Sequence, residues 1–322
     1  MVDIEKRGLI PWHPDYLLYS FGSDHPLQSD KLQIFIDKVH SSSLPLDIQT
    51  FVTPIVWKDI EPVVQENLLI KLKKMSETGK GQVDASTPAF LNMLYPARLS
   101  CQGTYLALKN VLLDRYQFSF NCLGGLHHAG PNFVGGGCLF NDMAVAINKI
   151  RIEGNRKSRI AIIDCDYHLH DGTLAYFGGD PMVFTASIHE NGWVGGEKDN
   201  EGWGKGMGTN INWEIKEPIS GSEYLTILRE EILPPIQQFN PELIFFLNGV
   251  DAHSEDPVTA NYMHRPFSLS DENYAELADI IADFALEVCE GKIVGLGAGG
   301  YSSEITSRVW VQTVHHFANK LL

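Results

Sequence analysis

Four short apolar runs along the chain end in residues that carry chemistry instead of ending in turns. Runs of this length predict buried strands, and open α/β sheets bind their ligands at the carboxyl ends of their strands. The runs and the residues that follow them are 160–163 with Asp164, Asp166 and His168; 243–248 with Asp251; 121–126 with His127 and His128; and 292–296 with Tyr301. We therefore expect these side chains to meet at one edge of a sheet.

Helical periodicity fills segments between these runs. After Ser270, apolar side chains recur at helical spacing as far as Gly291, which predicts a helix that faces the core. A second helix is expected to begin near Asn141. Strands that alternate with helices predict an α/β fold: a single domain over residues 1–322, with a central, mostly parallel sheet flanked by helices.

The acidic cluster after the first run favours a metal site. Strand alternation predicts that Asp164, Asp166 and His168 share one face. Any one of them has an ordinary structural explanation, because an Asp after a strand often caps the next helix and a lone His is usually a satisfied polar residue. Two neighbouring carboxylates at a buried strand end, however, repel each other unless a cation or donors compensate. Asp251, after the second run, is a third candidate ligand.

Composition agrees with a soluble enzyme and excludes some partners. Hydrophobic residues make up 44% of the 322 residues, which is enough for a substantial core. The net charge of −15 argues against direct nucleic-acid binding. Five cysteines, an odd number, suggest reduced thiols. With no apolar signal at the start and no segment long enough to span a bilayer, we expect a cytoplasmic protein.

Six short motifs, in order, resemble the histone deacetylase superfamily in its bacterial deacetylase-like branch. The resemblance implies the arginase/deacetylase fold, with a central sheet of about eight strands. The resemblance covers nearly the whole chain, and its specificity comes from the motifs together. They are residues 124–129, 136–142, 164–168 with Asp171 and Gly172, 187–189, 249–253 with Asp256 and Pro257, and 299–301.

The resemblance implies a role for each residue of the site. Asp166, His168 and Asp251 would bind one divalent ion, normally zinc, although two carboxylates and an imidazole also accept iron(II). His128 would be the general base, and Asp171 would be the carboxylate that orients it. His127 would be a second histidine, paired with the carboxylate of Asp164. Tyr301 would hold an oxyanion.

The family also implies a monovalent cation, usually potassium, close to the first strand. Its ligands would be the side chains of Asp164 and Ser187 and the backbone carbonyls of Asp166, His168 and Ile188. A cation with oxygen ligands there would also relieve the repulsion between Asp164 and Asp166.

Departures from the family concern the substrate more than the reaction. The family usually has an aromatic residue after the glycine that matches Gly136, as one wall of a tunnel for the acyl-lysine stem, but this chain has Gly137. A missing wall predicts a widened tunnel that tolerates bulkier acyl groups or substrates, unless a neighbouring side chain fills the gap. Trp193 is a candidate for the opposite wall, unless it only pins its own loop, and Asp84 is a candidate to grip the substrate backbone, unless it is merely solvated.

These features predict a zinc-dependent amidohydrolase that removes acetyl or longer acyl groups from N-acyl-lysine in peptides or proteins. Small acylated amines such as acetylpolyamines are the nearest alternative substrates. A binuclear ureohydrolase is weaker: His170 and His253 lie near arginase ligand positions, but the arginase pattern has carboxylates there. The sequence makes no prediction of the oligomeric state.

Overall fold

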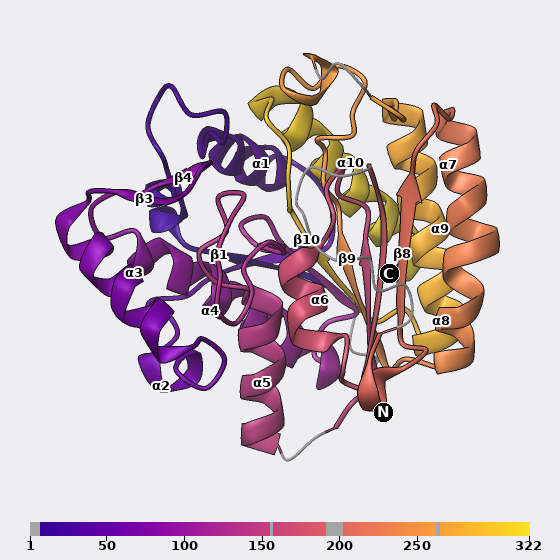
Figure 1. The fold of residues 1–322 in the computed structure, drawn as a ribbon. Coiled ribbons are helices and arrows are strands. Elements are labelled where there is room, and N and C mark those ends of the chain that lie inside the picture. The colour runs from indigo at the N-terminus through magenta and orange to yellow at the C-terminus, as the bar shows by residue number, and fades with distance from the viewer. Residues whose placement is uncertain (1–6, 155–156, 191–201, 262–264) are drawn as a thin grey trace.

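An eight-stranded, fully parallel sheet forms the centre of the computed structural model, which describes residues 7–154, 157–190, 202–261 and 265–322 (Figure 1). Its strand order is β2-β1-β5-β10-β9-β6-β7-β8, and each ladder between neighbours is parallel. The strands of this sheet are β1 (Gly8–Trp12), β2 (Leu46–Thr50), β5 (Phe118–Asn121), β6 (Ile160–Asp164), β7 (Val183–Glu190), β8 (Asn210–Ile215), β9 (Leu243–Leu247) and β10 (Ile293–Leu296). A short antiparallel pair, β3 (Gln82–Asp84) and β4 (Thr87–Pro88), lies apart from it.

Helices cover both faces of the sheet, with α3, α4 and α5 on one side and α7, α8 and α9 on the other (Figure 1). This arrangement confirms the predicted α/β class with a single domain. The helices are α1 (Asp30–His40), α2 (Trp57–Ile60), α3 (Glu66–Thr78), α4 (Leu94–Leu112), α5 (Asp142–Gly154), α6 (Asp171–Phe177), α7 (Gly221–Ile227), α8 (Leu233–Phe239), α9 (Asp271–Cys289) and α10 (Ser303–Leu321). Single turns are η1 (Pro14–Leu18), η2 (Gly204–Gly206), η3 (Leu228–Ile232) and η4 (Thr259–Asn261).

The predicted helix after Ser270 is α9, and local chemistry sets both of its ends. Ser270 caps the first turn through a reciprocal pair of hydrogen bonds with Asn273. At the other end Glu290 adopts a left-handed conformation (φ 58°) and Gly291 follows it. The prediction of a helix beginning near Asn141 is also confirmed, by α5.

Two details of the strand prediction are wrong. The third strand is β5, which ends at Asn121, so residues 122–126 form a loop instead of a strand. Gly125 has a φ of +86°, and a Cβ atom there would lie 2.9 Å from the backbone nitrogen of Ala298, so this loop turns against the segment after β10. The first strand, β6, stops at Asp164, and strand alternation therefore does not govern the positions of Asp166 and His168.

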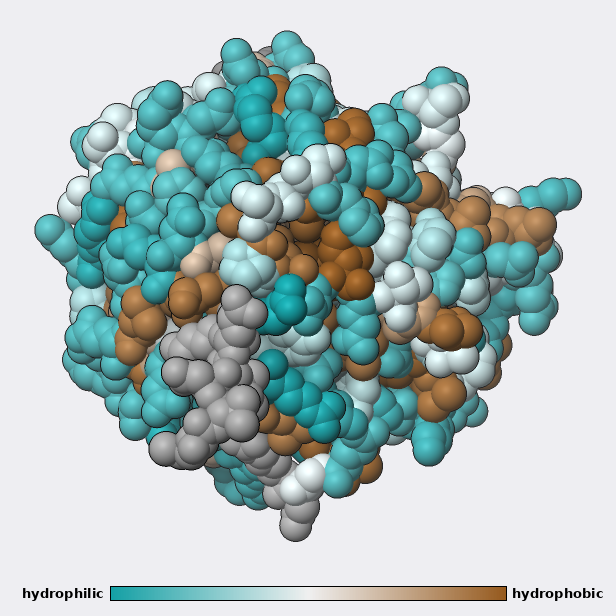
Figure 2. Space-filling view, turned by 180° about the vertical axis from the view of Figure 1, so that it is seen from behind, coloured by the Kyte–Doolittle hydropathy of each residue, from teal (hydrophilic) through white to brown (hydrophobic). Residues whose placement is uncertain are grey.

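The surface is polar on the side opposite to the view of Figure 1 (Figure 2). Figure 2 shows one face on which hydrophilic residues predominate and hydrophobic residues occur in scattered groups. Within the described ranges, none of the helices combines the length and the apolar character needed to cross a bilayer. All five cysteines are buried and none forms a disulfide, as their odd number suggested.

Candidate active site

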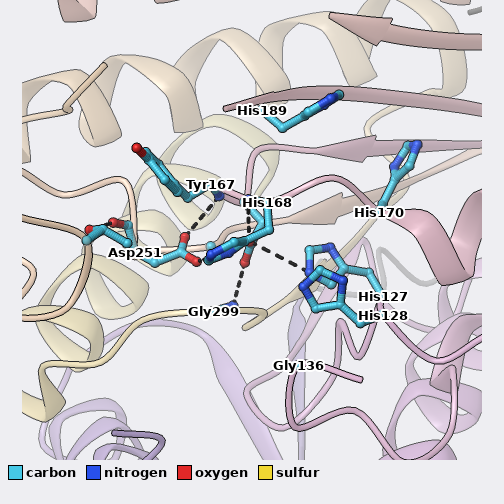
Figure 3. Close-up of polar contacts among 12 residues, drawn as sticks. His127, His128, Gly136, Tyr167, His168, His170, His189, Asp251 and Gly299 are labelled. Carbon is cyan, nitrogen blue, oxygen red and sulfur yellow. Dashed lines mark hydrogen bonds and ion pairs between the residues drawn. The ribbon is translucent and has the colours of Figure 1, made fainter. Parts of the chain in front are cut away.

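The four strands that carry the candidate residues are consecutive in the sheet, in the order β5-β10-β9-β6. Because they are parallel, their carboxyl ends lie at the same edge, and the loops that follow them meet there. These loops bring the histidine pair after β5 close to the loops after β6, β9 and β10 (Figure 3). The expectation that the polar residues after the apolar runs meet at one edge is therefore confirmed.

Asp166, His168 and Asp251 form a compact, buried group that can hold a metal ion. Their candidate ligand atoms all lie within 4.8 Å of one another. Nδ1 of His168 lies 3.1 Å from Oδ1 of Asp166 and 3.0 Å from Oδ2 of Asp251. Among the described residues, Oδ2 of Asp251 nevertheless accepts no hydrogen bond of regular geometry. A buried carboxylate oxygen in this state fits a cation ligand.

Backbone groups hold the two carboxylates in place. The N–H of Gly299 donates to Oδ2 of Asp166 at 2.8 Å, and the N–H of Tyr167 donates to Oδ1 of Asp251 at 3.0 Å (Figure 3). A Cβ atom on Gly299 would lie 2.5 Å from Oδ2 of both carboxylates, and one on Gly249 would lie 2.5 Å from that of Asp166. Glycines at these two positions thus leave the space in which the carboxylate oxygens sit.

The electrostatics of this group favour positive charge between the carboxylates. Burial tends to raise the pKa of Asp166, but the neighbouring His127 and His168 hold it well below its usual range. Burial and the charge of Asp166 raise the pKa of Asp251 to about 6. Burial opposes the charged form of His168, yet its contacts with the two carboxylates raise its pKa to about 10. A divalent cation would satisfy the same demand for positive charge.

The histidine pair has two different carboxylate partners and two different tendencies to ionise. His127 Nδ1 donates to Oδ2 of Asp164 at 2.8 Å, and His128 Nδ1 donates to Oδ1 of Asp171 at 2.7 Å. Burial opposes the charge on His127, but Asp164 and Asp166 outweigh it and raise its pKa to about 9. Burial, together with the charge of His127, lowers the pKa of His128 despite Asp171. The arrangement therefore favours a charged His127 beside a neutral His128.

Tyr301 is tied to the metal-ligand loop through Asp256, which is buried. Oδ2 of Asp256 accepts the backbone N–H of Tyr301 at 2.9 Å, and Oδ1 accepts the N–H groups of Val258 at 2.9 Å and Thr259 at 3.1 Å. The hydroxyl of Thr259 in turn donates to the backbone carbonyl of Asp251. One carboxylate therefore links the segment after β10 to the loop after β9.

Two connected cavities reach the site from the surface. The inner cavity, of about 70 Å³, is lined by the three candidate ligands, both histidines and Tyr301, and it extends past Lys31 and Cys122. The outer cavity, of about 440 Å³, is bordered by residues that include His25 and Asp84. A substrate can thus approach His128, His168 and Tyr301 from outside.

Gly136, Gly137 and Asp84 lie at the rim of the site, and the space beside Gly137 differs from the expected missing wall. A Cβ atom on Gly136 would lie 2.2 Å from the ring of His128, and the N–H of Gly136 donates to Oδ2 of Asp84 at 3.3 Å. Asp84 is therefore a support of this loop as well as part of the rim. At Gly137 the space is not open, because a Cβ atom there would lie 2.4 Å from Cδ1 of Leu27. The wall predicted to be missing is filled from the N-terminal segment.

Three of the positions expected around a monovalent cation, Asp164, Ser187 and Ile188, lie on β6 and β7. Asp164 and Ser187 are direct partners across the ladder between these strands, and Ile188 follows Ser187. The hydroxyl of Ser187 forms a hydrogen bond with His189 Nδ1 at 2.9 Å. His170 is fully buried, and its Nδ1 lies 3.7 Å from Oδ2 of Asp164.

Neither extra histidine joins the candidate metal group. His170 points away from His168 and Asp251 (Figure 3), and Nε2 of His253 lies 3.3 Å from Asp271 instead. In the part of the chain that the structure describes, the three-residue group above is the single group of three possible ligands. A binuclear site therefore gains no support from these residues.

Sequence reasoning missed Leu27 and Phe21, which line the inner cavity. No local pattern marks them, because their importance comes from contact with a loop far along the chain. The motif around Asp256 was noticed, but not its link to Tyr301. Trp193, the other proposed wall, lies outside the described residues.

The fold and this site together define a hydrolase of the arginase/deacetylase type. The family model of the histone deacetylase domain matches residues 25–317, so the chain belongs to the histone deacetylase family. It is therefore a hydrolase of the deacetylase class.

Individual relatives support this assignment. The chain is 29% identical over 322 residues to the acetoin utilization protein AcuC of Bacillus subtilis (strain 168), covering 95% of this chain and 81% of that protein. AcuC of Staphylococcus aureus (strain MSSA476) is 32% identical over 309 residues, covering 91% and 77%. A probable deacetylase of Archaeoglobus fulgidus is 27% identical over 300 residues, covering 92% and 81%.

The fold likeness extends to more distant proteins. The crystal structure of the HDA15 HD domain superposes with a TM-score of 0.84, covering 98% of this chain and 90% of that chain. The identity is 20%, so this comparison concerns the fold alone.

Proposed function

We propose that the protein is a zinc-dependent amidohydrolase that removes acyl groups from N-acyl-lysine in peptides or proteins. The observation that carries the proposal is the buried group of Asp166, His168 and Asp251. Beside it lie His127, whose pKa is raised, and His128, whose pKa is lowered. These three residues would hold the ion, and iron(II) is compatible with the same donors. When bound, zinc would supply Lewis acidity toward a carbonyl oxygen and lower the pKa of water to about 7.

His128 is the proposed general base. Its Nδ1–H donates to Asp171, which leaves the Nε2 lone pair available, and its lowered pKa keeps this nitrogen neutral near pH 7. Nε2 takes a proton from the attacking water and returns it to the amine nitrogen as the carbon–nitrogen bond breaks. Asp171 fixes the tautomer and the orientation of the ring throughout.

His127 and Tyr301 act on the charge that develops at the amide oxygen. The carboxylates of Asp164 and Asp166 keep His127 positive, so that it stabilises negative charge nearby. Tyr301 lines the cavity at the same place and can donate its hydroxyl to the oxyanion. No side chain needs to form a covalent intermediate.

We also propose roles for the residues expected to bind a monovalent cation or the substrate. A potassium ion held by Asp164, Ser187 and the carbonyls of Asp166, His168 and Ile188 is a proposal supported by the pairing of β6 with β7. Asp84 and Gly136 are proposed to contact the substrate from the outer cavity, and Gly137 from the inner one. Trp193 stays a prediction.

Small acylated amines are the second candidate substrates. The net charge of −15 favours cationic molecules such as acetylated polyamines, which would use the same catalytic residues. The test is a turnover panel of acetyl-lysine peptides, longer acyl-lysine peptides and acetylpolyamines, each with zinc and with iron(II). We expect the acyl-lysine peptides to give the highest kcat/KM. A preference for polyamines by tenfold or more would replace the proposed substrate class.

A further inference from the structure

The inner and outer cavities share five described lining residues, and these residues mark the passage between the two cavities. Those that line both cavities are Leu27, His128, Gly136, His168 and Tyr301. Three of them carry the polar groups assigned above to the reaction, and Gly136 has no side chain. Leu27 is therefore the one aliphatic side chain among the residues of this passage.

Leu27 reaches the passage because Gly137 leaves room for it. A Cβ atom on Gly137 would lie 2.4 Å from Cδ1 of Leu27 and 3.4 Å from Cε2 of Phe21. Gly137 also has a φ of +78°, a conformation that other residues rarely adopt. The wall is thus built from the N-terminal segment and cannot be shared with a side chain at position 137.

The segment that carries Leu27 is fixed by hydrogen bonds and ring packing. The N–H of Leu27 donates to Nδ1 of His25 at 3.1 Å, and Nε2 of His25 lies 2.9 Å from the backbone carbonyl of Ser86 and donates to it. Phe21 packs against His25 and Phe90, with ring centroids 4.8 and 5.5 Å apart. A wall held in this way can discriminate between substrates of different width.

We infer that Leu27 sets the width of the passage and restricts the amine part of the substrate to an unbranched chain. The inference rests on the proposed function, which places the reacting amide beside His128 and Tyr301. The outer cavity is the larger of the two, about 440 Å³ against about 70 Å³, and has the room for the rest of a peptide substrate, so the amine side of the amide crosses the passage toward it. An unbranched methylene chain contacts Leu27 without displacing it, whereas a branch meets its methyl groups.

The experiment compares two peptides that differ only by a methyl branch on the side chain of an acetylated lysine. Leu27→Ala should raise the branched-to-unbranched ratio of kcat/KM about tenfold, since one methylene in an apolar pocket changes discrimination by roughly 10- to 200-fold. Leu18→Ala is the matched control, because Leu18 is 52% exposed and lines neither cavity. It should leave the ratio within about twofold. An unchanged ratio in Leu27→Ala, or an equal rise in Leu18→Ala, overturns the inference.

A binding series separates this inference from the proposed function. The dissociation constants of straight-chain and branched alkyl hydroxamic acids for the zinc-loaded protein measure the width of the passage without turnover. Leu27→Ala should again favour the branched compound about tenfold relative to the straight one. If the wild type binds these probes but hydrolyses neither peptide, the proposed function fails, while the ratio of dissociation constants still decides the role of Leu27.

Discussion

Nδ1 of His128 donates a hydrogen bond to Oδ1 of Asp171 at 2.7 Å, and this contact determines which nitrogen of the imidazole is free to take a proton. Asp171 begins α6, so the helix that follows the metal-ligand loop also orients the proposed base. The same contact opposes the effect of burial on the pKa of His128.

Asp171→Asn should lower kcat by about 10²- to 10⁴-fold, because an amide can stabilise the wrong tautomer of His128. The variant should fold, since Asp and Asn have nearly the same shape. Asp283→Asn, which removes a surface partner of Lys320, is the control and should retain full kcat. A kcat for Asp171→Asn within threefold of the wild type would show that this carboxylate does not orient the base.

Tyr301→Phe should lower kcat by about 10²- to 10³-fold, as expected when one preorganised oxyanion donor is lost. The melting temperature should change little, because the side chain faces the cavity. Tyr95→Phe removes a hydroxyl that donates to Asp15 outside the site, and its kcat should be unaffected. Equal kcat values for the two phenylalanine variants would remove Tyr301 from the mechanism.

Asp256→Asn should destabilise the protein by about 1 to 3 kcal/mol, the cost of leaving a buried polar group unsatisfied. In one orientation of the asparagine side chain its NH2 group faces the N–H of Tyr301, and in the other its NH2 group faces the N–H groups of Val258 and Thr259. In either orientation two donors face each other. Urea unfolding measures the effect, and kcat should fall with it because the backbone of Tyr301 is displaced. A variant with wild-type stability and turnover would contradict the proposed link between the two loops.

Glu153 should make the stability of the protein depend on pH below about 5. Burial tends to raise its pKa, but Lys149, at 2.7 Å, with Tyr105 and Lys109 lowers it to about 2. A carboxyl group with a depressed pKa stabilises the fold above its unfolded pKa, near 4.5, and loses this contribution as the pH falls toward 2. The difference in melting temperature between the wild type and Glu153→Gln should therefore shrink between pH 6 and pH 3. A constant difference over this range would refute the assignment.

Much of the site could be predicted because parallel strands bring their carboxyl ends together. The apolar runs before Asp164, Asp251 and Tyr301 therefore located three of the four loops correctly. The boundaries of α9 were also predictable, since Ser270 and Gly291 act locally. The strand before His127 was misplaced because Ser119 interrupts the apolar pattern of β5, although it is buried and donates to the carbonyl of Leu9.

Contacts between distant segments could not be predicted from the pattern. Gly137 was correctly noticed as a departure, but only the folded chain brings Leu27 into the space beside it. The link from Asp256 to Tyr301 likewise joins two loops that follow different strands. Such contacts depend on the order of strands in the sheet, which local periodicity does not encode.

The most direct test of the central claim is a titration of zinc into metal-stripped protein while hydrolysis of an acetyl-lysine peptide is followed. One group of three ligands predicts no turnover before zinc is added, a linear rise, and a plateau at one equivalent per chain. Full turnover before any zinc is added, or a plateau at two equivalents, would contradict the account.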